Sequence, residues 1–209
     1  MIRKIKIFIL ISAVAALLGC HSDNTGELPR LGLPQIINGD TIPHSIPDFA
    51  FMNQDSQWVS NETFSQAVYV ADFFFTSCPT ICPKLTRSML RMHDHFEGRE
   101  DVLFLSHTID VRRDSIPRLK MYAENLGVSS DRWHFVTGDR DEIFDIAEDY
   151  MSIAIEDEDA PGGFDHSGWL ILVDQNRHIR SYGDGTDDEA VDRLIKDMER
   201  LLRETSPSG

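Results

Sequence analysis

The fold is decided by residues 68–83, which are VYVADFFFTSCPTICP. The first part, residues 68–75, is a continuous β-prone apolar run interrupted by one aspartate. Such a run is typical of a central strand that is buried on both faces of a sheet. Apolar residues then recur at helical spacing, which predicts a helix over residues 83–95. Cys78 and Cys82 therefore lie where a buried strand gives way to a helix.

Outward from this segment the chain alternates strands and helices. The predicted elements are a hairpin over 49–59, a strand over 102–108, a helix that starts at Asp114 or Ser115 and ends before Gly127, a strand over 133–137, a helix with a capping box at Asp139 and Glu142 that runs to Tyr150, strands over 168–173 and 178–182, and a last helix with a capping box at Thr186 and Glu189. This order predicts an α/β, thioredoxin-like fold with an N-terminal hairpin and a central, mostly parallel sheet flanked by helices.

The N-terminus has the features of a targeting segment. Three basic residues precede a nearly uninterrupted apolar run over residues 7–18, and Gly19-Cys20 follows. A charged start, an apolar stretch and a small residue at the end are typical of a secretory signal peptide. Residues 17–20, LLGC, resemble a bacterial lipobox. That resemblance implies cleavage before Cys20 and a lipidated cysteine that anchors the protein on the extracytoplasmic, periplasmic side of a membrane.

Three segments follow from this interpretation. Residues 1–19 are the predicted lipoprotein signal peptide, 20–47 a lipidated tether and irregular lead-in rich in proline and glycine, and 48–209 the thioredoxin-like domain. Removing three basic residues from a net charge of −15 leaves −18. So acidic a chain is not expected to bind nucleic acid, because phosphates would repel it.

The cysteine pair points to a functional site. If Cys20 is lipidated, Cys78 and Cys82 are the two that remain. A disulfide between such near neighbours closes a very short loop and stabilises the fold little, so a functional pair is favoured over a structural bridge. The positive end of a helix lowers thiol pKa values and favours the thiolate. Two thiolates are soft ligands that suit Cu(I), although zinc also accepts them.

A trigonal metal site needs a third ligand, and the chain has eight histidines. His134 lies within a predicted strand and is interpreted as a packed core residue. His107 is close to the end of a central strand and could approach the cysteines. His166 directly precedes another strand. The remaining five lie in the lead-in, on a helix or beside a turn, so His107 and His166 are the two candidates.

Four segments, in order, resemble the signatures of the SCO/SenC family. They are residues 78–83 (CPTICP) after the aromatic strand, 106–117 (SHTIDVRRDSIP), 131–138 (DRWHFVTG) and 165–167 (DHS) before the strand that leads to Asp174. A cysteine pair with this spacing alone is weak evidence, whereas four ordered signatures over most of the mature chain are specific.

The resemblance implies a thioredoxin-like fold and a copper site, Cu(I) or Cu(II), built from Cys78, Cys82 and His166. It also implies a metallochaperone that supplies a copper-receiving membrane oxidase subunit, at the binuclear copper centre of cytochrome c oxidase. Asp110 and Asp165, in the matching segments, are predicted to orient the ligands or balance their charge without binding the metal. For Asp110 the alternative is a residue that shapes the turn before a helix.

A second function fits the same residues. A thiol–disulfide oxidoreductase would use Cys78 and Cys82 as a redox pair that forms a Cys78–Cys82 disulfide and reduces cysteines of a copper-protein partner. A dithiol reductase does not need a converging histidine, so His166 favours a chaperone with little turnover of its own. A structural zinc module would want a fourth protein ligand, for which only His107 or a carboxylate is available.

Three further features each have two possible roles. Asp72, inside the buried strand, could tune the thiols or cap a turn. The acidic run Glu156–Asp159 could steer a cation or a basic partner, or be a solvated loop. Met89 and Met92 could offer thioethers to copper, but methionines at helical spacing are typical of a packed core.

Overall fold

A computed structural model describes residues 26–205. The strands are β1 (Gln35–Ile37), β2 (Asp40–Ile42), β3 (Ala50–Asn53), β4 (Trp58–Ser60), β5 (Val68–Phe74), β6 (Val102–Thr108), β7 (Trp133–Thr137), β8 (Ala154–Glu156), β9 (Phe164–His166), β10 (Trp169–Val173) and β11 (Ile179–Asp184). The helices are a 3-10 turn, η1 (Asn61–Phe64), and α2 (Cys82–His95), α3 (Ile116–Leu126), α4 (Arg140–Asp149) and α5 (Asp188–Thr205).

Seven strands form the central sheet, in the order β11-β10-β5-β6-β7-β3-β4. The centre, β5-β6-β7, is parallel, and every residue of β5 and β6 is buried. The strands on either side of this centre pair antiparallel. The α/β thioredoxin-like fold class predicted from the sequence is confirmed, but the prediction of a mostly parallel sheet is wrong: the two pairings within β5-β6-β7 are parallel and the other four of this sheet are antiparallel.

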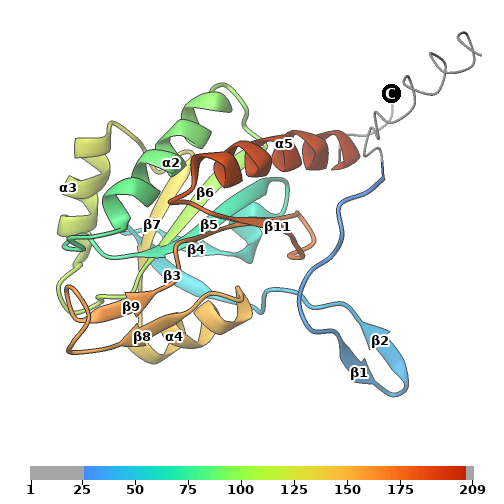
Figure 1. Ribbon diagram of the computed structural model, residues 1–209, viewed down its shortest axis with the longest axis horizontal. Coiled ribbons are helices and arrows are strands. Elements are labelled where there is room, and N and C mark those ends of the chain that lie inside the picture. Colours follow the sequence, from blue (N-terminus) through green and yellow to red (C-terminus); the bar gives the residue numbers. More distant parts are fainter. Residues whose placement is uncertain (1–25, 206–209) are drawn as a thin grey trace, which may run out of the picture.

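Helices cover both faces of the sheet, with α2 and α5 on one side and α4 on the other (Figure 1). Because successive strand residues point to opposite faces, neighbouring phenylalanines of β5 pack into different layers. Phe74 packs on Tyr122 of α3, with ring centroids 5.4 Å apart, and Phe73 packs on Tyr150, directly after α4, at 5.8 Å. The layer beneath α4 is largely aromatic.

The parallel centre also determines where a site can form. The carboxyl ends of β5 and β6 lie at the same edge of the sheet, so the cysteine segment after β5 and the Asp110 loop after β6 are neighbours. Met89 and Met92 of α2 are fully buried core residues. The helix before Tyr150 begins where predicted, and the Asp139 carboxylate accepts the backbone N–H groups of Asp141 and Glu142, which is the Asp139 half of the predicted capping box.

The predicted capping box at Thr186 and Glu189 is wrong. Helix α5 begins at Asp188, and the Asp187 carboxylate accepts the Glu189 backbone N–H at 3.1 Å. The Thr186 hydroxyl donates instead to Asp184, at 2.7 Å. An aspartate one residue closer to the helix takes the capping role, and local side-chain hydrogen bonding in the turn occupies the threonine.

Two short ribbons were not predicted. Strands β1 and β2 form an antiparallel ribbon inside the segment expected to be irregular, and β8 and β9 form another around the acidic loop. The signal for the first was Asn38-Gly39, whose positive φ angles of 54° and 91° make the tight turn that such a pair favours. Strands of three residues outside the main sheet carry too little periodicity for prediction.

The lead-in is attached to the body from Leu28 onward. Leu28 is buried, its backbone N–H donates to Glu204 at 2.8 Å, and its carbonyl accepts from the Arg180 guanidinium at 2.6 Å. Leu31 forms a bridge to Ile179 of β11. Among residues 26–205, none of the helices combines the length and the apolar content that a membrane crossing requires.

Candidate metal centre

The two cysteines lie in and after a tight turn. Strand β5 ends at Phe74, residues 75–81 form the turn, and α2 begins at Cys82. The Cys78 backbone N–H donates to the Phe75 carbonyl at 3.2 Å, so Cys78 lies before the helix rather than on it. Both thiols are buried and free. The turn brings the two sulfurs together.

The third predicted ligand arrives from a distant part of the sequence. His166 is the last residue of β9, whose pairing with β8 places it opposite Ala154. Its Nε2 lies 3.4 Å from the Cys82 Sγ, and the donor atoms of Cys78, Cys82 and His166 all lie within 4.8 Å of one another. The structure therefore brings the three predicted ligands into one cluster that a single metal ion could bridge.

The histidine hairpin packs against the cysteine turn through Phe75. The Phe75 ring lies 5.1 Å from the Phe164 ring and 5.8 Å, edge-on, from the imidazole of His166. At Gly162, in the hairpin loop, an added Cβ would come within 2.7 Å of Phe75, and the backbone has a φ of +86°. Only glycine fits this close approach and this left-handed conformation.

The imidazole of His166 is arranged to offer Nε2. Its Nδ1 lies 3.3 Å from the Ser167 carbonyl, and because a carbonyl can only accept, Nδ1 carries the proton and donates. The Nε2 lone pair is then free to face the thiols, which is the tautomer that a metal ligand needs. Burial lowers the pKa of His166 below its usual value, despite an opposing effect of the Ser167 hydrogen bond, and so favours the neutral ring.

The two thiols differ in their acidity. Burial disfavours ionisation of Cys78, but hydrogen bonds from the Cys82 thiol and from the backbone of Thr80 and Cys82 outweigh it and lower the Cys78 pKa. For Cys82, burial and then the hydrogen bond to Cys78 raise the pKa well above its usual value. Cys78 is therefore the thiol that ionises first, and Cys82 the one that holds the proton.

A buried acid lies beneath the cysteine turn. Asp72 of β5 accepts a hydrogen bond from the Ser106 hydroxyl, which in turn accepts from the Trp133 indole N–H at 2.9 Å. Burial raises the Asp72 pKa to about 7, and a charge on Asp72 would further raise that of Cys82. Asp72 bonds a neighbouring strand rather than a turn, so of the two predicted roles the structure favours electrostatic influence on the thiols.

Asp110 and Asp165 contact the site less directly. Asp110 is buried and accepts from the Arg113 guanidinium at 3.1 Å, while the same guanidinium lies 3.5 Å from the Gly162 carbonyl. Asp110 is thus linked through Arg113 to the hairpin loop. Asp165 is exposed, and its charge acts on His166 by opposing the lowering of the His166 pKa.

The structure removes His107 from the candidate ligands. His107 is fully buried in β6, stacked on Phe73 with ring centroids 4.7 Å apart and edge-on to Phe51 at 5.7 Å. Burial lowers its pKa to about 3, so the ring is neutral. It belongs to the aromatic layer beneath α4, and the described residues offer no fourth protein ligand to the cluster. His134 is buried in β7, as predicted.

Sequence reasoning missed the residue that fixes the cysteine turn. Asp114 is fully buried and accepts the Thr76 backbone N–H at 2.9 Å and the Thr108 hydroxyl at 2.6 Å. It joins the start of the turn to the end of β6. The available signal was its place in the second matching segment, where the sequence suggested only a helix start at Asp114 or Ser115.

The acidic loop is partly neutralised. Glu156 pairs with Arg140 at 2.9 Å and lies 3.7 Å from Arg112, and the Arg140 hydrogen bond lowers the Glu156 pKa. Two of the three remaining acids, Asp157 and Glu158, border a polar pocket beside Asp110 and Phe164. The predicted lipidation residue, Cys20, lies outside the described residues.

Known proteins resemble this chain in both sequence and fold. The family model described as SCO1/SenC matches residues 40–203. The SCO1 protein homolog of Bacillus subtilis is 29% identical over 161 residues, which is 76% of this chain and 83% of that protein. The crystal structure of a SCO1/SenC family lipoprotein from Bacillus anthracis is 27% identical, with a TM-score of 0.69, over 82% of this chain and 99% of that one. The structure of BsSco is 29% identical, with a TM-score of 0.67, over 77% of this chain and 94% of that one. BsSco is described as having a disulfide switch and as a member of the Sco family of cytochrome c oxidase assembly proteins.

Proposed function

The chain belongs to the SCO1/SenC family, and from that premise we propose that it is a copper metallochaperone for the assembly of a respiratory copper site. It binds copper through Cys78, Cys82 and His166 and delivers it to a membrane oxidase subunit, at the binuclear copper centre of cytochrome c oxidase. Copper is the cargo of this protein rather than a resident cofactor. The relative BsSco, described as a cytochrome c oxidase assembly protein, supports the choice of recipient.

One observation carries the proposal: two sulfurs and one imidazole nitrogen converge within 4.8 Å on a buried cluster. The donor set fits copper in both oxidation states. Two thiolates satisfy Cu(I), which prefers soft ligands, and the harder imidazole contributes more to Cu(II). Three ligands also leave a fourth position through which a recipient's ligand could enter and displace them one at a time, without net oxidation or reduction.

The acidity of the thiols supports stepwise loading. Cys78 has the lowered pKa and offers a thiolate first. Cys82 has the raised pKa, so it releases its proton as the metal binds, because a bound cation lowers the pKa of a ligating thiol. Neutral His166 contributes Nε2 without losing a proton.

The same asymmetry favours one alternative, a thiol–disulfide oxidoreductase. The Cys78 thiolate would attack a partner's disulfide, forming a mixed disulfide and releasing one partner thiol. The Cys82 sulfur, once deprotonated, would then attack the Cys78 sulfur, release the second partner thiol and leave a Cys78–Cys82 disulfide. A separate dithiol reductant would restore the pair. The disulfide switch described for BsSco supports keeping this alternative.

The proposed location is the extracytoplasmic face of a membrane. Residues 1–19 would be a signal peptide, Cys20 the lipidated first residue, 20–47 the tether and lead-in, and 48–209 the copper-binding domain. The Bacillus anthracis relative is described as a lipoprotein, which supports this interpretation. Mass spectrometry of the mature N-terminus tests it. A diacylated Cys20 is expected, and an unmodified N-terminus at any other residue would contradict it.

The function itself is tested by two assays on one sample of the reduced chain from His21 onward. Cu(I) is titrated in competition with a chelator, and the rate at which the protein reduces a small disulfide substrate is measured in parallel. A chaperone is expected to bind one Cu(I) tightly, to lose that binding when Cys78 and Cys82 are oxidised, and to reduce the disulfide slowly. Fast reduction together with weak copper binding would instead establish the oxidoreductase.

A further inference from the structure

The β1–β2 ribbon stands apart from the rest of the fold. Its two strands pair only with each other in the part of the chain that the structure describes, and the ribbon projects from the body (Figure 1). It lies at one end of the long axis of the molecule, whereas β9 and the first turn of α2 lie at the other. A two-stranded ribbon of this kind is marginally stable in water, so a contact that covers it would be favourable.

Apolar side chains are exposed on both faces of this ribbon. The register pairs Gln35 with Ile42 and Ile37 with Asp40, which places Ile37 and Ile42 on one face and Ile36 on the other. Ile36 is 78% exposed, and Leu33, directly before the ribbon, is 87% exposed. Residues 33–42 carry a single charged group, Asp40.

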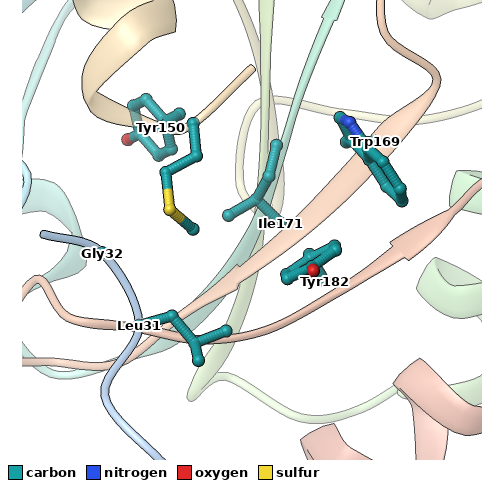
Figure 2. A pocket seen from close by; sticks show the side chains of 7 residues that line it. Leu31, Gly32, Tyr150, Trp169, Ile171 and Tyr182 are labelled. Atoms are coloured by element: carbon teal, nitrogen blue, oxygen red, sulfur yellow. The ribbon is translucent and has the colours of Figure 1, made fainter.

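The apolar surface continues onto the body at the base of the ribbon. A pocket opens there beside Leu31 and Gly32, where the lead-in crosses the sheet (Figure 2). Met151 and Tyr182 line it and are 40% and 51% exposed. Six of the ten exposed large apolar side chains of the described chain lie on the ribbon, just before it or in this pocket. A cluster of this kind marks a contact surface.

The chain before the ribbon determines what can reach it. Leu28, which is held to the body through Glu204 and Arg180, lies eight positions after the proposed lipidation site, Cys20. Fully extended, eight residues span at most about 28 Å. A lipid on Cys20 would therefore hold this end of the molecule close to the bilayer surface, with the ribbon beside it.

Two further observations favour lipid over a protein surface. A flat protein partner covers one face of a ribbon and leaves Ile36 or Ile37 in water, whereas surrounding lipid covers both. The chain is strongly acidic and the ribbon has no basic residue, so a contact here has to be apolar rather than electrostatic.

We propose that the β1–β2 ribbon and Leu33 form a second membrane contact, which lies in the headgroup–acyl boundary and orients the domain with its metal site away from the bilayer. The proposal rests on the lipid anchoring proposed above. Unpaired backbone groups at the ribbon edges would be costly in hydrocarbon, which limits the depth to the interface. The polar turn at Asn38-Gly39-Asp40 is compatible with that depth.

The test uses the mature lipidated protein, with its N-terminal mass confirmed, reconstituted in phosphatidylcholine vesicles that carry brominated acyl chains. Ile36→Trp places an indole on the ribbon. The matched control, Met121→Trp, replaces a 57% exposed apolar residue of α3, at the opposite end of the molecule. Each variant is compared with the parent protein, which has three tryptophans of its own.

The added fluorescence of Ile36→Trp is expected to shift to the blue, to be quenched by the brominated lipid at least twofold and to be shielded from aqueous iodide, while Met121→Trp shows none of these effects. Equal iodide quenching of the two variants on vesicles would overturn the proposal. Shielding of Ile36→Trp without vesicles, together with a dimeric mass in solution, would assign the ribbon to a second copy instead. A missing lipid would appear in the mass, and a failed copper site in the metal titration, so neither is confused with failure of the ribbon contact.

Discussion

The cysteine turn and the histidine hairpin build one site by different means. The turn is continuous with the buried strand β5, and Asp114 ties it to β6 by accepting hydrogen bonds from Thr76 and Thr108. The hairpin is a separate two-stranded ribbon that reaches the cysteines across 84 positions of sequence. It is held against the turn by the Phe75 ring and the close approach of Gly162.

This difference separates the two halves of the proposed metal site. The sulfurs are positioned by the core of the fold, so conservative changes at the thiols should leave the structure intact. The imidazole is positioned by a packing contact at the edge, so it can be displaced without touching a ligand. The difference also predicts that the sulfur pair dominates affinity, while the hairpin determines how well the site holds Cu(II).

The largest effect is expected from removing a sulfur. Cys78→Ser and Cys82→Ser each replace a soft thiolate with a hydroxyl that Cu(I) binds poorly. Substituting a residue that only supports a metal ligand lowers affinity roughly 10- to 100-fold, and the loss of Cu(I) affinity here should be larger. Competition titration measures the affinity, and circular dichroism checks that the fold survives. Tight Cu(I) binding by either folded variant would place the site elsewhere.

The hairpin can be displaced through its loop. Gly162→Ala adds a Cβ that would lie 2.7 Å from Phe75, at a φ of +86°. We expect the Cu(II) form to be lost or to change its visible spectrum. Cu(I) affinity should fall about tenfold, as it does when a residue that supports a metal ligand is substituted.

Gly163→Ala is the matched control for the loop. Gly163 has a similar φ of +92°, but a Cβ added there would meet no atom within 4 Å beyond its chain neighbours, so the variant carries the backbone strain without the collision. A Cu(II) spectrum that changes equally in both variants would show that loop strain, rather than contact with Phe75, positions the hairpin.

Asp72, buried beneath the cysteine turn, predicts a pH effect on stability. Asp72 titrates near 3.8 when unfolded, and burial raises its pKa to about 7 in the folded protein. Between these values the folded protein binds more protons than the unfolded chain, so the free energy of unfolding falls as pH rises from about 4 to about 7. The difference of about three between the two pKa values limits this loss of unfolding free energy to about 4 kcal/mol. Because the protein relaxes around the charge, we expect a loss of about 2 kcal/mol.

Asp72→Asn keeps a side chain that can accept from Ser106 and removes the titrating group. Urea unfolding of both proteins at pH 4 and pH 7.5 should show a stability loss in the parent that is smaller in the variant. An equal loss in the two proteins would mean that Asp72 is not the group responsible.

The contrast between turn and hairpin also explains what the sequence could predict. Strands β6 and β7 were predicted with their bounds, because a buried strand between helices has a strong apolar signal. Cys78 and Cys82 were singled out because the strand-to-helix change and the thiol chemistry are local. The ribbons β1–β2 and β8–β9 were missed, since three-residue strands carry almost no periodicity.

The sequence pattern alone could not decide whether His166 or His107 is the third metal ligand. Each lies beside or within a strand, and periodicity does not say which side of the sheet its imidazole meets. The structure places His107 in the aromatic layer with Phe73 and His166 beside Cys82. The resemblance of residues 165–167 to a known signature, not the local pattern, had selected His166. Asp114 and Phe75 were overlooked because their roles depend on long-range packing.

The most direct test of the central claim is the copper spectrum of His166→Ala, measured beside the parent and a control, His95→Ala, whose histidine is exposed on α2 and pairs with Glu199. Imidazole is a harder donor than thiolate and matters more for Cu(II). We predict that His166→Ala keeps measurable Cu(I) binding through its two sulfurs but loses the thiolate-to-copper absorption of the Cu(II) form, while His95→Ala retains it. Unchanged Cu(II) absorption in His166→Ala would contradict a site made of Cys78, Cys82 and His166.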